Sequence, residues 1–380
     1  MSTSIRARSW REFNPIMVVA VLLLLAISVP MVYTTTVGAA GTLVFGLGSS
    51  FAKHIVWVSM GISLMFGLAM VDYQLLRSLA IVLYIAALGL LGMVVALGQV
   101  KYGAQSWIGS SQLSFQPTEP AKLMVIIALA AFWSKHGDEP SPWKSVFISL
   151  GILAVPLGLV MLQPDFGSGM VMIGIWLVMS LVANTRWVQY GILTLFSAPV
   201  VVLAWLKFDE YQRERLTVFL TPERCETDLE FRMRACWQII QSRLAIGNGG
   251  LGGMGLLRGV QSQLNYLPVQ ESDFIFAVTA EELGFIGAAV VIVLQLIIIW
   301  QIWRVVERAR DPFGRLMAAG VAGLLLVHCL ENMGMNLIMM PMTGIPLPFL
   351  SYGGSFTLTV LMGIGVVLSV SIRSKRWSFN

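Results

Sequence analysis

Charged residues are scarce in this chain. Only 12% of its 380 residues are Asp, Glu, Lys or Arg, and 57% are hydrophobic, whereas an average soluble domain carries roughly 25% charged residues. The charges also cluster, which leaves long uncharged tracts between them. Too few charged side chains remain to cover a water-soluble globule, so the composition predicts a protein whose outer surface mostly contacts lipid.

Histidine is rarer still, and the pattern of a metal site is missing. The three histidines are scattered without the spacing of metal ligands, so we expect no metal site built from them. They are His54, His136 and His328. The chain also lacks a basic patch interleaved with aromatic residues, so its net charge of +5 does not indicate nucleic-acid binding.

Long apolar segments are the most abundant feature. Because the hydrocarbon core of a bilayer is about 30 Å thick, a spanning helix needs roughly 20 apolar residues. Ten segments meet or approach this length: residues 16–36, 55–71, 79–100, 118–133, 146–163, 169–184, 188–206, 274–303, 316–340 and 354–372. We therefore expect an all-α, polytopic membrane protein with about ten transmembrane helices, and one membrane domain over residues 1–380.

The basic residues of the short loops predict the orientation, because cytoplasmic loops are enriched in Lys and Arg. The opposite short loops offer little beyond Lys53 and Lys101. We therefore expect both termini in the cytoplasm, on the side of the richer set. That set is Arg6, Arg8, Arg11, Arg77, Lys135, Lys144, Arg186, Arg304, Arg308, Arg310, Arg315, Arg373, Lys375 and Arg376.

Residues 207–273 form the longest loop, on the external side. A loop of this length is usually functional or disordered, and its apolar and aromatic residues favour an ordered one. Residues 230–246 have the pattern of an amphipathic helix. Cys225 and Cys236 both lie in this loop, where an oxidising compartment would let them pair; the sequence leaves open whether they do. Cys329 lies in an apolar segment, where we expect it to be inert packing.

Two acidic positions stand out before the long loop. Glu119 and Lys122 in QPTEPAK are three residues apart at the start of a helix, so they share a face. The helix dipole explains Glu119 but not a Lys at membrane depth, which leaves structural tuning and substrate contact both open. Asp165 in QPDFG lies between two helices, where a helix cap is the favoured interpretation.

A third acidic position, Asp273, comes immediately before the eighth segment. A cap would be the usual interpretation, yet the neighbouring loop is rich in arginine. Arg215, Arg243 and Arg258 could bind phosphates, since a planar guanidinium matches phosphate oxygens. The glycine-rich residues 245–255 are not followed by Lys-Ser/Thr, so they are not a nucleotide-binding P-loop. The uncharged, proline-containing stretch around Ser351 must be buried or line a cavity.

Four long motifs carry a family resemblance. IIQSRLAIGNGGLGGMG, QSQLNYLP, SDFIFAVTAEELGFIG and TGIPLPFLSYGGS resemble the SEDS family (RodA, FtsW and SpoVE), and the likeness runs from about residue 15 to 375. The forms of the second and fourth motifs resemble the RodA branch more than the FtsW branch. This resemblance implies a peptidoglycan glycosyltransferase of the cytoplasmic membrane that polymerises lipid II into glycan strands during cell elongation, with an extracytoplasmic active site.

The resemblance also implies roles for individual residues. The catalytic aspartate of the family falls on Asp273, and the Glu and Lys of a family motif fall on Glu119 and Lys122. Asp165 matches the acidic residue of a family turn, and Arg215 matches an arginine after a Tyr-Gln pair. We count Ser351, in the last motif, with the supporting residues.

Partners are implied as well. The resemblance predicts a class B penicillin-binding transpeptidase as protein partner, together with lipid II, a glycan linked to undecaprenyl pyrophosphate, and membrane lipids. The sequence leaves open whether a divalent cation such as Mg²⁺ or Mn²⁺ takes part.

The chain departs from the family in two places. The family often reads PE-x-HTDF where this chain reads PVQESDF, so Glu271 occupies the position of a histidine and no step is assigned to that histidine. Residues 222–241 look longer than usual and contain both loop cysteines.

Two rival functions fit a helical membrane protein. A lipid II transporter would also place polar residues inside the bundle, but the inverted repeats typical of transporters are not seen here. A scaffold for cell-wall enzymes would need no carboxylate at a lipid-accessible position.

Overall fold

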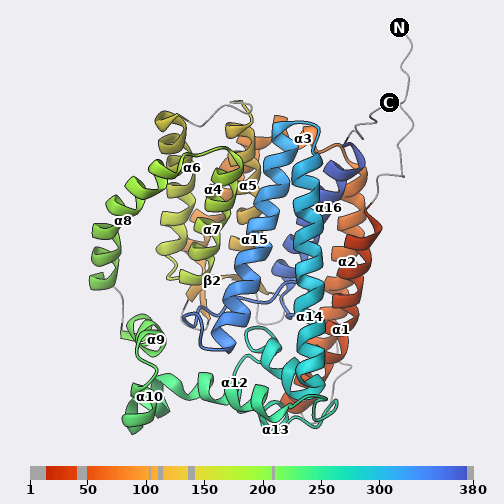
Figure 1. Ribbon diagram of the computed structural model, residues 1–380, viewed down its shortest axis with the longest axis vertical. Coiled ribbons are helices and arrows are strands. Elements are labelled where there is room, and N and C mark those ends of the chain that lie inside the picture. The colour runs from red at the N-terminus through yellow and green to blue at the C-terminus, as the bar shows by residue number, and fades with distance from the viewer. Residues whose placement is uncertain are drawn as a thin grey trace.

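The computed structural model describes residues 14–40, 49–101, 104–109, 114–135, 142–207 and 210–374. Each of the ten predicted segments coincides with one helix, which confirms the all-α, polytopic prediction (Figure 1). These helices are α1 (Pro15–Ala40), α2 (Ser50–Met70), α4 (Ala80–Leu97), α5 (Thr118–Trp133), α6 (Trp143–Met161), α7 (Phe166–Val182), α8 (Trp187–Lys207), α14 (Ile275–Arg308), α15 (Pro312–Asn336) and α16 (Gly354–Ile372).

Seven helices within the described ranges are long and apolar enough to cross a membrane by themselves: α1, α2, α4, α6, α14, α15 and α16. Helix α7 is apolar but has only 17 residues. Helix α5 has 16 residues and carries Glu119 and Lys122. Helices α15 and α16 are the most enclosed of the seven, because 78% and 83% of their residues in the apolar window are buried. They therefore form the centre of the bundle.

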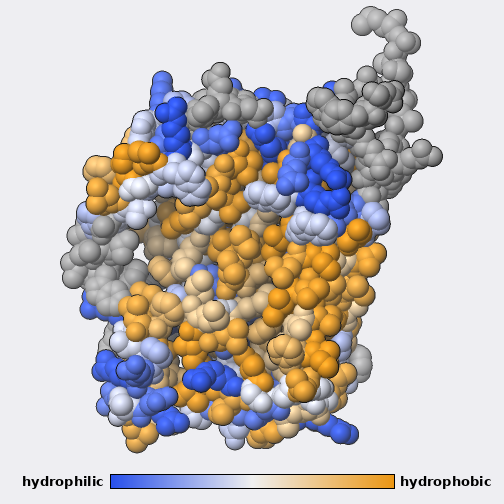
Figure 2. All heavy atoms as spheres, viewed as in Figure 1, coloured by the Kyte–Doolittle hydropathy of each residue, from blue (hydrophilic) through white to orange (hydrophobic). Residues whose placement is uncertain are grey.

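The helices run alternately between two ends of the molecule (Figure 1). One end holds α3 (Gln74–Ser78), the turn between α14 and α15, and the end of α16; the other holds the strands and α9 to α13. Hydrophilic residues gather at both ends, and a hydrophobic band lies between them (Figure 2). The band matches the surface that a bilayer would cover.

The predicted cytoplasmic residues that the structure describes lie at the α3 end. Arg77 is in the last turn of α3, Arg308 is in the last turn of α14, and Arg373 caps α16. Their shared position agrees with the predicted sidedness, which itself stays a prediction. Arg6, Arg8, Arg11, His136, Lys375 and Arg376 lie outside the described residues.

Three short strands that we did not predict join α4 to α5. They are β1 (Gln99–Lys101), β2 (Ala104–Gly109) and β3 (Ser114–Phe115), paired antiparallel in that order. Helix α4 consequently ends at Leu97, before the predicted limit of 100. The sheet brings Ser106 on β2 next to the start of α7.

The long loop is ordered and mostly helical. It contains α9 (Glu210–Leu220), α10 (Arg224–Thr227), α11 (Leu229–Phe231), the π-helical turn η2 (Arg232–Cys236), α12 (Trp237–Asn248) and α13 (Val260–Gln263). The predicted helix over 230–246 is therefore present but interrupted by η2. Cys225 and Cys236 form a disulfide with Cα atoms 5.9 Å apart, and Cys329 is free and buried.

The glycine-rich stretch fills a break in α14. Gly284 has φ 69° and ψ −170°, which interrupts the helix and requires glycine. The amide of Phe285 donates to the carbonyl of Gly250 (2.8 Å), and the amide of Gly255 donates to the carbonyl of Glu282 (3.0 Å). A Cβ on Gly253 would collide with that same carbonyl oxygen. These glycines let the loop backbone hydrogen-bond to the broken helix.

Candidate active site

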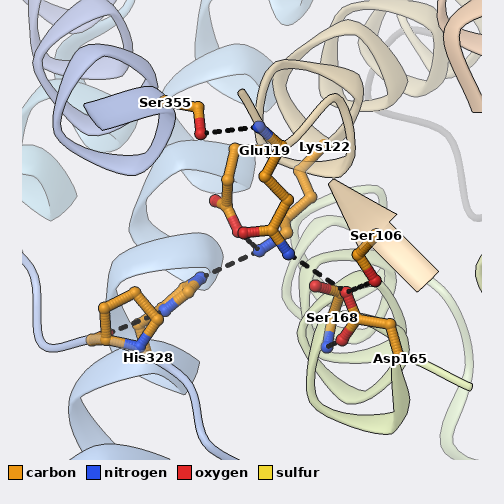
Figure 3. Close-up of polar contacts among 9 residues, drawn as sticks. Ser106, Glu119, Lys122, Asp165, Ser168, His328 and Ser355 are labelled. Atoms are coloured by element: carbon orange, nitrogen blue, oxygen red, sulfur yellow. Dashed lines mark hydrogen bonds and ion pairs between the residues drawn. The ribbon is translucent and has the colours of Figure 1, made fainter. Parts of the chain in front are cut away.

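The first part of the site is a buried ionisable cluster. Lys122 Nζ donates to Glu119 Oε1 at 2.8 Å and lies 3.3 Å from Nε2 of His328 (Figure 3). All three side chains are almost wholly buried. An ammonium group has donors only, so Nε2 of His328 must be the acceptor; the proton then sits on Nδ1 and is donated to the carbonyl of Pro346 at 3.1 Å. The cluster is thus joined to the 341–351 segment.

Asp165 caps a helix, as the sequence favoured. Its Oδ1 accepts from the amide of Ser168 in the first turn of α7 at 3.0 Å. Its Oδ2 accepts from Gln116 Nε2 at 3.2 Å and from Ser106 Oγ at 3.4 Å (Figure 3). Gln116 directly precedes α5, so the carboxylate also ties α7 to the helix that carries Glu119 and Lys122.

Asp273 lies at the start of α14, at the end of the bundle where the long loop folds. Its main-chain oxygen accepts from the side-chain amides of Asn332 (3.0 Å) and Asn336 (3.2 Å) on α15. Its Oδ1 accepts from Ser272 Oγ at 2.8 Å. The backbone of Asp273 is therefore held by α15, and the residue as a whole is half-buried.

The surroundings of Asp273 shift its proton affinity. Loss of solvation raises the pKa of the carboxyl to about 6, against the opposing effects of the Ser272 hydrogen bond and the Arg215 charge; the Glu271 charge raises it further. A carboxylate with a pKa near 6 is a stronger base than an ordinary Asp and is still ionised at neutral pH.

Arg215 on α9 is the predicted arginine that the structure places beside Asp273. A Cβ built on Gly344 would lie 3.2 Å from Asp273 Oδ2 and 4.0 Å from Arg215 Nη1, so the two charged groups flank this glycine. Arg243 and Arg258 are instead exposed on α12 and on the loop after it. Of the three predicted arginines, Arg215 is therefore part of the Asp273 site, whereas Arg243 and Arg258 lie on the exposed surface.

The 341–351 segment links the two parts of the site. The carbonyl of Ile345 accepts from Asn332 Nδ2 at 2.8 Å, and the next carbonyl, of Pro346, faces His328. Ser351 Oγ accepts from the amide of Leu347 at 2.7 Å and donates to the carbonyl of Ser272 at 2.6 Å. Ser351 consequently supports the turn before Asp273. Most of this non-helical segment is buried, as its depth in a membrane requires.

Sequence reasoning missed the polar face of α15. His328, Asn332 and Asn336 are four residues apart, so they lie on one face of the helix, and that face joins Lys122 to Asp273. Asn336 Oδ1 also accepts from Ser242 Oγ on α12 at 2.9 Å. In the sequence, His328 is one of three scattered histidines. The signal that could have found the set is its four-residue spacing in an otherwise apolar helix.

Buried ionisable groups that hydrogen-bond to a non-helical segment, with a half-buried Asp beside the same segment, define a multi-pass membrane protein with a built polar site.

The comparisons with known proteins agree over nearly the whole chain. The model of the FtsW/RodA/SpoVE family, described as a cell cycle protein, matches residues 15–376. The peptidoglycan glycosyltransferase MrdB of Escherichia coli K12 is 33% identical over 368 residues, which cover 97% of this chain and 95% of MrdB. The chain belongs to the FtsW/RodA/SpoVE family, which confirms the resemblance to SEDS proteins.

Solved structures share the fold. The rod shape determining protein RodA of Thermus thermophilus matches with a TM-score of 0.68 and 26% identity, covering 95% of this chain and 97% of RodA. A chain from a peptidoglycan synthase complex that coordinates polymerisation and crosslinking matches with a TM-score of 0.75 and 28% identity, covering 94% of this chain and 97% of that one.

Proposed function

We propose that this protein is a peptidoglycan glycosyltransferase that polymerises lipid II into glycan strands during cell elongation, with Asp273 as general base. The observation that carries the proposal is the position of Asp273: the residue is half-buried, lies with Arg215 around Gly344, and has its pKa raised to about 6 by loss of solvation. The family membership and the glycosyltransferase MrdB support the same reaction class.

The proposed chemistry is one displacement. The 4-hydroxyl of the acceptor sugar attacks the anomeric carbon of the lipid-linked donor, and the bond from that carbon to the pyrophosphate oxygen breaks. Asp273 accepts the hydroxyl proton as the new glycosidic bond forms. The leaving pyrophosphate gathers negative charge, which Arg215 stabilises. Arg243 and Arg258, exposed on the same loop, are proposed to contact phosphates of the lipid-linked substrates.

Glu119, Lys122 and Asp165 act at a distance in this proposal. Lys122 is wholly buried and reaches the 341–351 segment only through His328. We assign these residues, with Ser351, to holding the segment against Asp273, and not to contact with the reacting atoms.

The next question is whether a divalent cation takes part in the reaction. In the part of the chain that the structure describes, no group of three or more His, Cys, Asp or Glu side chains gathers that could hold a metal ion. A cation beside Asp273 would take its further ligands from the substrate or from water, and the proposed displacement proceeds without one.

Sidedness and partner complete the proposal. The Cys225–Cys236 disulfide belongs to the same loop as Arg215, and a disulfide persists in an oxidising compartment. This supports an active site outside the cytoplasm and both termini inside. We further propose a class B penicillin-binding transpeptidase as partner, since the similar chain of known structure belongs to a synthase complex.

The alternative of a lipid II transporter is less well supported. A transport path needs polar groups along the bundle, but the ionisable cluster lies in the first turn of α5 and the second half of α15. From Leu123 to the end of α5, and from Leu316 to Val327 on α15, the residues are apolar or glycine. Apart from Arg315 in the first turn of α15, the charged and polar side chains of α5 and α15 lie at the end that carries Asp273.

Purified protein incubated with labelled lipid II separates these functions. Glycan strands on gels are expected from the wild type and not from Asp273→Asn, whereas Glu226→Gln, which alters an exposed acid of the same loop, should retain activity. Lipid II crossing proteoliposomes without strand formation would favour the transporter, and neither product would favour a scaffold. Normal strand synthesis by Asp273→Asn would overturn the proposed base.

A further inference from the structure

A small apolar core, separate from the main one, surrounds the loop disulfide. It combines residues of the long loop with residues next to the Asp273 site. The members used below are Val218, Cys225, Cys236, Ile239, Phe274 and Met342. All six side chains are buried, so this "disulfide core" is a packed unit.

One side of the disulfide core carries Arg215. Val218, which is 1% exposed, follows Arg215 by three residues on α9, so the two side chains leave the same face of the helix. Helix α9 packs on η2, the turn that ends at Cys236. A short turn, closed by the bond from the Arg224 amide to the Thr221 carbonyl (3.1 Å), then leads directly to Cys225.

The other side of the disulfide core carries Asp273. Phe274 is the next residue in the chain, and Met342 precedes Gly344 by two residues. Ile239 places α12 in the same core, and α12 is tied to α15 by the hydrogen bond from Ser242 to Asn336. The disulfide core therefore holds both members of the Arg215–Asp273 pair.

Between the two cysteines, the disulfide core also holds Phe231, which is 4% exposed, and the Phe231 amide donates to Asp228 Oδ1 at 3.0 Å. Helices α10 and α11 have four and three residues, and η2 is a single π-helical turn; pieces so short are not stable alone. The ion pair of Arg224 with Asp228 spans 3.6 Å and is largely exposed, so it contributes little. The disulfide is the covalent link that joins the two ends of this part of the loop.

We propose that the Cys225–Cys236 disulfide is a positioning device for glycosyl transfer, which holds η2 and α10 in place and thereby keeps Arg215 beside Asp273. This inference rests on the proposed function.

The charges around Asp273 determine how loss of the disulfide would appear. Arg215 comes from α9, and Glu271 comes from the same turn as Asp273. Helix α15 offers the uncharged Asn332 and Asn336, with Glu331 buried between these and His328; the 341–351 segment has no charged residue. Arg215 is the cation that lowers the Asp273 pKa, so moving α9 away raises that pKa.

The test measures the pH dependence of polymerisation for the wild type, Cys225→Ser/Cys236→Ser, Arg215→Gln and the triple variant, with Cys329→Ala as the control for cysteine removal. A rise of about one pKa unit from about 6 lowers the ionised fraction of Asp273 at pH 6 about fivefold. The ratio of the rate at pH 8 to the rate at pH 6 should grow by about that factor in the serine variant and in Arg215→Gln. The triple variant should show no further change.

Amide exchange measured by mass spectrometry gives a readout that needs no activity. Peptides covering 210–220 should exchange faster in Cys225→Ser/Cys236→Ser and in reduced wild type, while peptides of α15 stay protected. An unchanged pH ratio in an active serine variant, or unchanged exchange of α9, would overturn the positioning role. A wild type that makes no glycan would instead contradict the proposed function, and the exchange result would still decide whether the disulfide holds α9.

Discussion

The side-chain amide of Asn332 donates to the main-chain oxygen of Asp273 at 3.0 Å and, with the same nitrogen, to the carbonyl of Ile345 at 2.8 Å. One buried side chain thus fixes both the turn that carries the proposed base and the segment that lies against its carboxylate. His328, one helical turn earlier, extends the same arrangement to Lys122. The site is therefore organised by α15, a helix whose own side chains need not touch the substrate.

Acid should inhibit polymerisation. Asp273 accepts a proton only when ionised, so the rate should fall as the pH drops through about 6 and be half-maximal near that value. The charge of Glu271 raises the pKa of Asp273, so Glu271→Gln should move the midpoint to lower pH. Initial rates of strand synthesis between pH 5 and pH 8, set here by the range about the pKa, provide the check; a flat profile would contradict the assignment.

The stability of the protein should fall more when one member of the buried pair Glu119 and Lys122 is replaced than when both are replaced. Their side chains are 3% and 0% exposed, so Lys122→Met leaves a buried carboxylate without its cation, at a cost of about 3–5 kcal/mol. The double variant Glu119→Gln/Lys122→Met should recover much of that loss. Thermal unfolding in detergent measures both; equal destabilisation of the two variants would show that the pairing is unimportant.

His328 should be replaceable by glutamine but not by leucine. A glutamine amide has an acceptor for Lys122 and a donor for the Pro346 carbonyl, the two bonds that His328 makes. Leucine leaves both partners unsatisfied, which costs about 1–3 kcal/mol for each buried polar group. We expect His328→Gln to keep strand synthesis and His328→Leu to lose stability and activity together. Retained activity in His328→Leu would show that the hydrogen bonds of His328 to Lys122 and Pro346 are not needed for the reaction.

Gly344→Ala should impair activity more than an ordinary glycine substitution. Gly344 has φ 71°, and an added Cβ would lie 3.2 Å from Asp273 Oδ2. The left-handed conformation alone costs a side chain about 1–2 kcal/mol, and the methyl group occupies space beside the carboxylate. Gly247→Ala on α12, where a Cβ meets nothing within 4 Å, is the matched control. Comparable rates for both variants would argue against a close approach at Gly344.

The sequence revealed the features that depend on local composition. Long apolar runs predicted all ten helices, and the unusual Lys at membrane depth pointed to Glu119 and Lys122. It could not reveal contacts between distant segments: nothing near His328 in the chain shows that Lys122 lies against it. The sequence could not decide whether Cys225 and Cys236 pair for the same reason, because pairing depends on the distance between them in the folded loop.

Local sequence patterns fall short at two places. The segment 79–100 was extended into Gln99 and Val100, which belong to a strand because they pair with β2. The glycines of 245–255 showed only that backbone could approach something closely. Their partner is the break at Gly284, thirty residues further along, which no local pattern announces.

The break at Gly284 divides α14 into a short part next to Asp273 and a long part that exposes apolar side chains. The part of α14 after the break exposes Phe285, Val293 and Trp300, and a helix with such a surface tilts to match the thickness of its bilayer. The ten residues between Asp273 and Gly284 are instead anchored to α15 and the glycine loop. The glycine loop also holds the first turn after the break, through the amides of Phe285 and Ile286, so its backbone determines the direction in which the outer part of α14 leaves the site.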